Sequence, residues 1–516
     1  MMPSIHRPAE PETIRETFAG LALKTLTNGG HRPAFVSAEH TLGCLDAVSR
    51  VAAMQRLLGG SRPPRLALLS RNKPDAWLLQ IAAMALGGSV VWLHPRASLS
   101  DSVFVIGDSK ANALAIDADV DLELVEALAL GFHGPVFRLS KHGPGTPVAD
   151  VLEGMVSDEV VDRSLPDELA LLAYTGGTTG KPKAVIRTQA DWALIAKRIV
   201  EDYEIELESR YLVAGPISHV SGTKILPTLM CGGTAYALAE ATPPAVAAAI
   251  ERWRITSTLL VPTALNALAE EQAVRPRDLS SLTKLFYGGA SIAADQLRRA
   301  VEVFGPVLYQ VYGQTECYPL CRLKPKDLDP ELPHRWRSCG TPVPSIKVRL
   351  VDLSGDDVAQ GSVGEVIASG EQVMRGYWSR PAETADALQG HWLHTGDLAY
   401  AHRDGFIEIV GRTKDMIISG GFNIYAREVE AALEAHPAVE VAAVYGLPDA
   451  KWGEAVTASV VLRSENLATT DELTAWVRQL KGSFQVPKRL EFIESMPMTS
   501  VGKIDKKALR QRWSLC

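Results

Sequence analysis

Apolar strands and helices alternate along the chain from residue 65 onward, and this order constrains the fold more than any other feature. The pattern predicts strands at residues 65–70, 89–93 and 112–116 and helices at residues 74–86 and 100–110. A βαβαβ order is typical of a largely parallel sheet covered by helices. We therefore expect an α/β protein whose N-terminal body is built from doubly wound βα subdomains.

The alternation returns further along the chain, because strands are predicted at residues 211–215, 235–239, 256–261 and 285–288 and a helix at residues 245–252. A second group of parallel strands with covering helices is therefore expected after the first.

Two later regions have a different pattern of predicted elements. Residues 344–411 contain short β-type segments, which predict an antiparallel or β-barrel-like subdomain, and from residue 412 a small α+β unit begins. The short β-type segments are residues 347–351, 364–368 and 406–410. The last unit has predicted helices at residues 426–435 and 469–480 and predicted strands at residues 439–446, 455–462 and 490–494. The predicted division is a body of residues 1–411 and a C-terminal domain of residues 412–516.

Composition excludes several classes of function. Lys and Arg number 53 against 60 Asp and Glu, a net charge of −7, which argues against a nucleic-acid-binding protein. The most apolar stretch, residues 78–93, is shorter than the ~20 residues that a membrane span needs. The N-terminus has no apolar core of a secretory signal, and six cysteines are too few for a disulfide scaffold. These features predict a cytoplasmic protein.

A cysteine-rich segment could imitate a zinc site. Cys317, Cys321, His334 and Cys339 have spacings that zinc ligands can adopt, but they include no CxxC pair. We interpret Cys317 and Cys321 as helix-spaced buried thiols beside an unrelated loop.

The strongest chemical signal is the segment YTGGTTGKPK, residues 174–183. Its glycines allow a tight turn with backbone N–H groups directed at an anion. Its hydroxyls and lysines add further donors and positive charge. The segment therefore predicts a loop that binds a polyphosphate, although it differs from the common P-loop at Thr175 and Pro182. The loop residues are Thr175, Gly176, Gly177, Thr178, Thr179, Gly180 and Lys181.

This loop resembles the phosphate loop of the adenylate-forming enzymes, which include acyl-CoA synthetases, luciferases and peptide-synthetase adenylation domains. Five further motifs of the family follow in order. They are YGGAS at 287–291, YGQTE at 312–316, HTGD at 394–397, GRTKD with ISGGFNI at 411–424, and PMTSVGKI at 497–504. Six ordered motifs over residues 174–504 are most like those of a bacterial acyl-CoA synthetase.

The resemblance implies where ATP and magnesium bind. Tyr312 would stack on adenine, Asp397 and Arg412 would hold the ribose, and Glu316 would be the Mg²⁺ ligand. Taken alone, Tyr312 could be a core tyrosine and Asp397 a turn residue. The other implied nucleotide-binding residues are Gly288, Gly289, Ala290, Gly313, Gln314 and Thr315.

The resemblance also implies a catalytic lysine and a mobile C-terminal domain. Lys503 would stabilise the charge that develops when a carboxylate attacks the α-phosphate, although by its sequence alone it is one lysine of a basic tail. Lys414 would be the hinge between two domain positions. Gly420 and Gly421 would line the channel for the thiol of coenzyme A. The implied catalytic set is Lys503, Glu316, Thr175 and His219.

The acid is expected to be hydrophobic. His219 stands where amino-acid-activating relatives carry Asp, so an amino acid is disfavoured. His219 would gate or wall the acid pocket, although a hydrogen-bonded core histidine remains an alternative. The candidate pocket walls are His219, Val220, Gly288, Gly289 and Cys317.

The sequence thus favours an ATP-dependent acid–CoA ligase. The expected ligands are a small carboxylic acid, ATP, Mg²⁺ and coenzyme A, bound by a monomer or homodimer. Two departures from the family pattern, Met498 and Gln485, replace basic residues, and the second weakens the assignment to coenzyme A. An adenylating enzyme that serves a carrier protein or an oxygenase chemistry, and a non-catalytic nucleotide-binding relative, remain alternatives.

Overall fold

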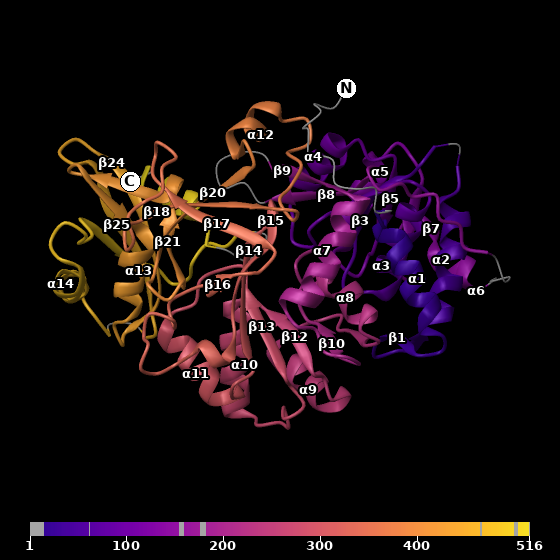
Figure 1. Cartoon of the computed structure of the whole chain (residues 1–516), viewed down its shortest axis with the longest axis horizontal. Helices are drawn as coiled ribbons and strands as arrows, with labels where there is room; N and C mark the ends of the chain where they lie inside the picture. The colour runs from indigo at the N-terminus through magenta and orange to yellow at the C-terminus, as the bar shows by residue number, and fades with distance from the viewer. Residues whose placement is uncertain are drawn as a thin grey trace.

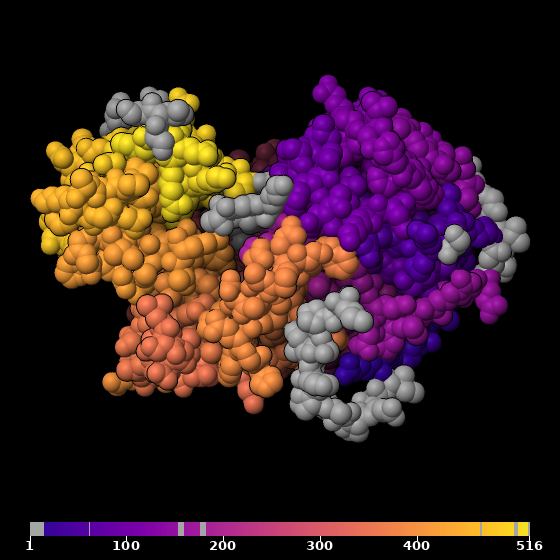
Figure 2. Space-filling model, turned by 90° about the horizontal axis from the view of Figure 1, so that it is seen from above, coloured from indigo at the N-terminus to yellow at the C-terminus, as the bar shows by residue number. Residues whose placement is uncertain are grey.

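Four sheets follow one another along the chain in the computed structural model. The structure describes residues 15–60, 62–153, 159–175, 182–464, 467–499 and 504–514. Two helix-covered sheets form the body, and the last sheet forms a lobe at the opposite end of the molecule (Figure 1). Figure 2 shows this C-terminal lobe beside the body, with a hollow between the two.

The first sheet has seven strands in the order β7-β6-β5-β3-β4-β8-β9, and every neighbouring pair is parallel except β8 with β9. Its strands are β3 (Arg65–Leu69), β4 (Ser89–Trp92), β5 (Ala113–Ile116), β6 (Val136–Arg138), β7 (Thr146–Pro147), β8 (Leu169–Thr175) and β9 (Lys183–Thr188). The helices around it are α1 (Phe18–Gly29), α2 (Cys44–Leu58), α3 (Pro74–Ala85), α4 (Leu99–Ser109), α5 (Leu122–Gly131), α6 (Val148–Glu153) and α7 (Gln189–Asp202). The predicted βαβαβ unit is confirmed.

The apolar stretch 78–93 is a buried helix, a turn and a strand, as its length implied. Helix α3 packs against α1 and α2, so even its polar Gln80 is buried. The chain then turns at Gly87 and Gly88 into β4. A Cβ atom on Gly88 would lie 2.2 Å from the carbonyl oxygen of Pro64, so only glycine fits there. The part of the chain that the structure describes contains no helix long and apolar enough to cross a membrane.

The second sheet has nine strands in the order β16-β15-β14-β13-β12-β10-β11-β1-β2. Its strands are β1 (Pro33–Val36), β2 (Thr41–Gly43), β10 (Arg210–Val213), β11 (Thr234–Ala237), β12 (Ser257–Leu260), β13 (Lys284–Gly288), β14 (Leu308–Gln314), β15 (Cys317–Leu323) and β16 (Thr341–Pro342). The helices between its strands are α8 (Ile225–Met230), α9 (Pro243–Trp253), α10 (Pro262–Val274) and α11 (Ala294–Phe304). Its centre is parallel, and β14 and β15 form an antiparallel hairpin.

The third sheet is antiparallel, as predicted for residues 344–411, and the fourth sheet, in the predicted α+β unit, is mainly antiparallel. The third contains β17 (Ile346–Val351), β18 (Gly364–Gly370), β19 (Leu388–Gln389), β20 (Trp392–Ala401) and β21 (Ile407–Arg412), with α12 (Pro381–Ala387) before β19. The fourth contains β22 (Met416–Ser419), β23 (Phe422–Tyr425), β24 (Val439–Asp449), β25 (Gly453–Leu462) and β26 (Arg489–Phe492). Its helices are α13 (Ala426–Glu434), α14 (Thr470–Lys481) and α15 (Lys506–Ser514). A capping box of Thr469 and Glu472 opens α14, the helix predicted at residues 469–480.

One asparagine ties the first sheet to the second. Asn72 follows β3, and its Nδ2 lies 3.0 Å from the carbonyl oxygen of Val213, 3.1 Å from that of Gly215 and 3.1 Å from that of Leu238. Its Oδ1 accepts a hydrogen bond from the backbone N–H of Ile217 at 2.8 Å. The carboxyl ends of β3, β10 and β11 are thereby held at one place.

We predict that Asn72→Ala lowers the free energy of unfolding by roughly 2–4 kcal/mol, because it leaves several carbonyl groups and one N–H without their partner. Asn72→Asp should cost more, since a carboxylate cannot donate to the carbonyls. Asn28→Ala, at an exposed position on α1, is the control and should change little. Urea unfolding followed by circular dichroism measures all three, and an Asn72→Ala curve that overlays the wild type would contradict the prediction.

Candidate functional site

The predicted phosphate loop connects β8 and β9 at the carboxyl edge of the first sheet. Thr175 ends β8 and pairs with Lys183 of β9, and its hydroxyl donates to the carbonyl oxygen of Lys183 at 3.3 Å. Anion-binding loops commonly follow a parallel strand at this edge. The loop residues between them lie outside the described residues: Gly176, Gly177, Thr178, Thr179, Gly180 and Lys181.

Glu316 lies beside this hairpin, in the turn between β14 and β15. Its Oε1 accepts a hydrogen bond from the Tyr377 hydroxyl at 2.7 Å, and its carbonyl oxygen accepts from the N–H of Met374. The ammonium of Lys183 stands over the Tyr377 ring, 5.1 Å from its centroid. Tyr377 therefore joins the strand that follows the loop to the predicted metal ligand. No motif in the sequence marks Tyr377.

A buried guanidinium fixes the backbone of the same turn. Arg187 of β9 is 1% exposed and donates to the carbonyl oxygens of Thr315 at 2.6 Å and Gln372 at 2.8 Å. Burial lowers its pKa, while the nearby charges of Asp191 and Glu316 act in the opposite direction. Arg187 was also missed, because its partners lie far away in the sequence.

Asp397 is the centre of a second cluster, on β20. Its Oδ2 accepts from the Tyr312 hydroxyl and its Oδ1 from the Arg412 Nε, both at 2.6 Å. Asp397 is 6% exposed, and burial followed by the Asp397 charge raises the pKa of Tyr312 well above its ordinary value. The side-chain amide of Gln314 donates to the carbonyl oxygen of Thr395, two residues before Asp397. The YGQTE and HTGD motifs thus meet in space.

The predicted adenine-side residues end strand β13 next to this cluster. Gly288 pairs with Val311 of β14, and a Cβ atom on Gly288 would lie 2.2 Å from the Val311 carbonyl oxygen. Gly289 has a φ of +82° and is exposed together with Ala290. Gly288 is therefore required by strand packing, and Gly289 and Ala290 are accessible to a ligand.

His219 forms a pair with a histidine from the other sheet. The rings of His219 and His94 stand edge to face with centroids 4.7 Å apart, and His219 Nδ1 is 2.7 Å from the Ser218 hydroxyl. Burial lowers the pKa of each histidine to about 4, and for His94 the charges of His219 and Arg96 add to the effect. Both rings are therefore neutral at pH 7. His94 carried no motif that the sequence analysis could recognise.

Cys317 does not lie with the other predicted pocket walls. It is completely buried on β15 in a cluster with Val185 and Val373, whereas the next residue, Tyr318, lies in the cluster that contains Val220. Successive strand residues point to opposite faces, so Tyr318 and not Cys317 lies on the face of β15 that packs with Val220. Burial raises the pKa of the Cys317 thiol to about 12, so it is protonated.

The zinc alternative is not supported, and the expected helix is wrong. Cys317 and Cys321 lie on strand β15, where spacing by four residues places both on one face. His334 contacts the carboxylate of Asp404. Within the described ranges, no group of three His, Cys, Asp or Glu residues could hold a metal ion.

The described C-terminal candidates lie in two exposed turns. Lys414 is exposed in a short turn before β22, and Gly420 and Gly421 form the exposed β22–β23 turn with φ values of +60° and +82°. A Cβ atom on Gly420 would lie 2.9 Å from the Trp452 ring. Gln485 is buried and donates to Glu428 at 3.2 Å. The predicted catalytic Lys503 lies outside the described residues.

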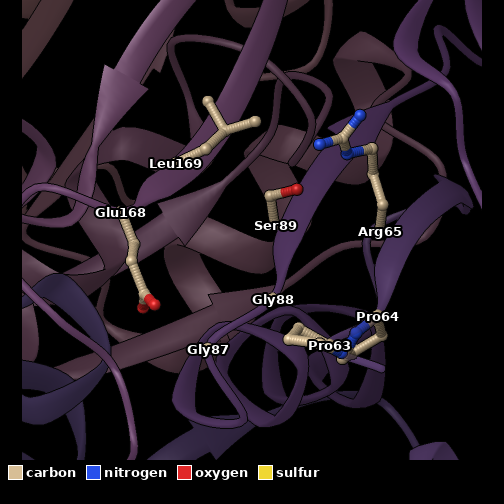
Figure 3. A pocket seen from close by; sticks show the side chains of 8 residues that line it. All are labelled: Pro63, Pro64, Arg65, Gly87, Gly88, Ser89, Glu168 and Leu169. Atoms are coloured by element: carbon tan, nitrogen blue, oxygen red, sulfur yellow. The ribbon is translucent and has the colours of Figure 1, made fainter. Parts of the chain in front are cut away.

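A separate cavity of about 150 Å³ opens at the opposite edge of the first sheet. Arg65, Ser89 and Leu169, which line it, are the first residues of β3, β4 and β8. Figure 3 shows the Glu168 carboxylate and the Arg65 guanidinium on opposite sides of it, pointing apart. None of the candidate site residues that the structure describes lines this cavity.

The histidine pair makes the stability of the fold depend on pH. The pKa of His94 is about 4 in the folded chain against 6.5 in the unfolded chain, so the unfolded chain binds more protons between these values. The contribution of the neutral His94 to the free energy of unfolding is therefore fully present above pH 6.5 and is lost as the pH falls toward 4. We predict that His94→Phe flattens this loss, as measured by the melting temperature from pH 7 to 4. His133→Phe, at an exposed position, should follow the wild type, and parallel curves for His94→Phe and wild type would refute the assignment.

Comparisons with known proteins identify the family of the chain. Residues 27–378 match the family described as AMP-binding enzyme, and residues 428–503 match the AMP-binding enzyme C-terminal domain. The chain is 40% identical over 485 residues to the medium/long-chain-fatty-acid–CoA ligase FadD8 of Mycobacterium tuberculosis, covering 91% of this chain and 84% of that protein. It is 37% identical to a feruloyl-CoA synthase of Amycolatopsis sp., covering 90% and 92%.

Two solved structures of related enzymes have the same fold as this chain. The amide bond synthetase McbA from Marinactinospora thermotolerans superimposes with a TM-score of 0.87 at 32% identity, covering 96% of this chain and 99% of that one. The o-succinylbenzoate CoA synthetase MenE from Bacillus subtilis, solved with its acyl-adenylate, has a TM-score of 0.83 at 27% identity, covering 95% and 97%. The chain therefore belongs to the AMP-binding enzyme family, the adenylate-forming acyl-CoA synthetase superfamily that its motifs resemble.

Proposed function

We propose that this chain is an AMP-forming acid–CoA ligase. In the first step a carboxylate oxygen attacks the α-phosphorus of ATP, and pyrophosphate leaves. In the second step the sulfur of coenzyme A attacks the acyl carbon, and AMP leaves. The observation that carries the proposal is the meeting of the phosphate-loop hairpin, Glu316 and the Asp397 cluster at the carboxyl edges of two sheets. The ligase relatives support the same reaction.

The nucleotide would lie across the second cluster. Asp397 already holds Tyr312 and Arg412, and each carboxylate oxygen can accept a further hydrogen bond from a ribose hydroxyl. Arg412 keeps its terminal N–H groups for the sugar or the phosphate, because only its Nε contacts Asp397. Gly289 and Ala290 would border the adenine, and the backbone of residues 313–315 would lie beside it.

Glu316 fits the role of a magnesium ligand. Magnesium in nucleotide sites is commonly held by one or two carboxylates together with substrate phosphates, so a single carboxylate beside a phosphate loop suffices. The Tyr377 hydroxyl orients Glu316 from one side and leaves the carboxylate at the edge of the loop hairpin. When bound, the ion would neutralise charge on the phosphates of ATP.

The C-terminal domain, which we place at residues 412–516, would act in both steps. Lys503 would reach the α-phosphate in the first step. A rotation at Lys414 would then bring Gly420 and Gly421 toward the acyl group, where the absence of side chains leaves room for a thiol arm. Gln485 is buried inside this domain, where it donates to Glu428.

The acid would be hydrophobic and would approach between His219, Val220 and Gly288. His219 is neutral and held by Ser218, which is suited to a wall or gate and offers no negative charge to an amino group. A fatty or an aromatic acid is compatible with this wall, in agreement with the fatty-acid and feruloyl ligases among the relatives.

Acid-dependent ATP–pyrophosphate exchange across a panel of carboxylates tests the first step. We predict exchange with hydrophobic fatty or aromatic acids and none with amino acids, followed by loss of free thiol and formation of AMP when coenzyme A is added. Exchange with no thiol loss would instead favour a carrier protein, or an amine acceptor as the likeness to McbA suggests. Absence of exchange with every acid would refute the proposal and favour a non-catalytic relative.

Lys503→Ala separates the two steps. We predict that it lowers adenylate formation by roughly 100-fold or more, because a fixed charge that stabilises the transition state is removed. Thioester formation from supplied acyl-adenylate should stay near the wild-type rate. Lys507→Ala, in the same basic tail, is the matched control and should retain both steps. Equal losses in the two steps of Lys503→Ala would contradict the assigned role.

A further inference from the structure

Lys224 is a fully buried lysine inside an aromatic box. It ends the short turn before α8 and is 0% exposed. Its ammonium lies 4.3 Å from the ring centroid of Tyr203, 4.7 Å from that of Phe286 and 5.7 Å from that of Tyr318. Its Nζ donates to the Tyr318 hydroxyl at 3.2 Å.

Such a lysine is unusual, because a buried ammonium is normally paired with a carboxylate. Burial alone lowers the pKa of Lys224 to about 7, and no charged group among the described residues contributes. The Tyr203 hydroxyl is also buried and completes no hydrogen bond in the described chain. The faces of three rings offset part of the cost of burying the charge. An apolar side chain would nevertheless suit this interior better.

The box is connected to the proposed acid pocket through the segment that carries His219 and Val220. Lys224 follows His219 and Val220 in one segment, and the Thr223 hydroxyl donates to the Val220 carbonyl oxygen at 2.7 Å. Val220 packs in the same cluster as Tyr203, Phe286 and Tyr318.

The second wall of the pocket continues into the box in the same way. Phe286 precedes Gly288 by two positions on β13, so both face the same side of the sheet. The box is therefore joined to both proposed walls of the acid pocket, and Lys224 is its charged group.

We propose that Lys224 and Tyr318 recognise the end of the acid that is remote from the reacting carboxylate, and select aromatic acids that carry an oxygen acceptor there. This inference rests on the proposed ligase activity and its acid pocket. An ammonium has three donors, and Tyr318 accepts from one of them. A phenol, phenolate, methoxy or carbonyl oxygen on the substrate would accept from another. The three aromatic rings suit a planar substrate, and a hydrocarbon end would give the other donors of the ammonium no acceptor.

Matched pairs of acids test the inference in the pyrophosphate exchange assay. The probes are 4-hydroxycinnamate against cinnamate, 4-hydroxybenzoate against benzoate, and octanoate as a hydrocarbon acid. For the wild type, the pair that reacts faster should show a kcat/KM at least about tenfold higher for its oxygenated acid than for its unsubstituted acid. The reason is that a site built to hydrogen-bond a substrate rejects the analogue that lacks the hydrogen-bonding oxygen.

Lys224→Met keeps the length of the side chain and removes its donors. It should reduce that preference to about threefold or less by lowering kcat/KM for the oxygenated acid, with little change for the unsubstituted acid. Lys224→Gln retains a donor and should give an intermediate ratio. Lys347→Met, at an exposed position on β17, is the matched control and should keep the wild-type ratio.

Two results would overturn the inference. One is an unchanged preference in Lys224→Met or Lys224→Gln protein that melts cooperatively. The other is a higher kcat/KM of the wild-type enzyme for the unsubstituted acids or for octanoate. That result is obtained without any variant. A lysine with a structural role alone would move the melting temperature and leave the ratio unchanged. Exchange with no acid at all would overturn the proposed function itself, so the two failures are distinguishable.

Discussion

A single buried guanidinium holds three parts of the molecule together around the candidate site. Arg187 comes from the strand that follows the phosphate loop, and it binds the backbone of the Thr315–Glu316 turn and of Gln372, which follows β18. Each hydrogen bond from a charged group contributes about 1.5–3 kcal/mol. Glu316 follows Thr315 in a turn of only two residues, so the bond from Arg187 to the Thr315 carbonyl oxygen fixes the position of Glu316 relative to the phosphate-loop hairpin.

Around this junction, the two parallel sheets place their carboxyl edges side by side. Asn72 ties the ends of β3, β10 and β11, and the His94–His219 pair joins the same sheets nearer the acid pocket. Loops at the carboxyl ends of parallel strands are the usual place for ligand binding in such folds. The nucleotide and the acid are then expected on the same side of the body, facing the hollow beside the C-terminal lobe in Figure 2.

The predicted elements agree with the structure to within a few residues, because their signals are local. The helix expected at residues 426–435 is α13 (Ala426–Glu434), and the strand expected at 347–351 is β17 (Ile346–Val351). Apolar periodicity, capping residues and glycines act over a few positions, so they can be read directly. The site was predicted as far as motifs reach: Asp397, Arg412 and Tyr312 do form one cluster.

What the sequence could not provide is the contacts between distant segments. Tyr377 binds Glu316 across 61 positions, and Lys224 reaches Tyr318 across 94. The residues next to these side chains in the sequence do not indicate either contact. A tyrosine or a lysine with such neighbours is equally compatible with a surface or a core position. Cys317 was placed on the pocket wall because the sequence does not say which face of β15 turns toward Val220.

The sequence by itself determined the order of strands and helices, the six family motifs and the chemistry of adenylation. Those features depend on residue type and local spacing. Only the tertiary structure decided that Tyr318 and not Cys317 packs in the cluster of Val220, that Arg187 and Tyr377 support Glu316, and that Lys224 is buried without a carboxylate. The physical reason is that burial and pairing are properties of packed sheets, and side chains far apart in the chain become neighbours only when the sheets close on one another.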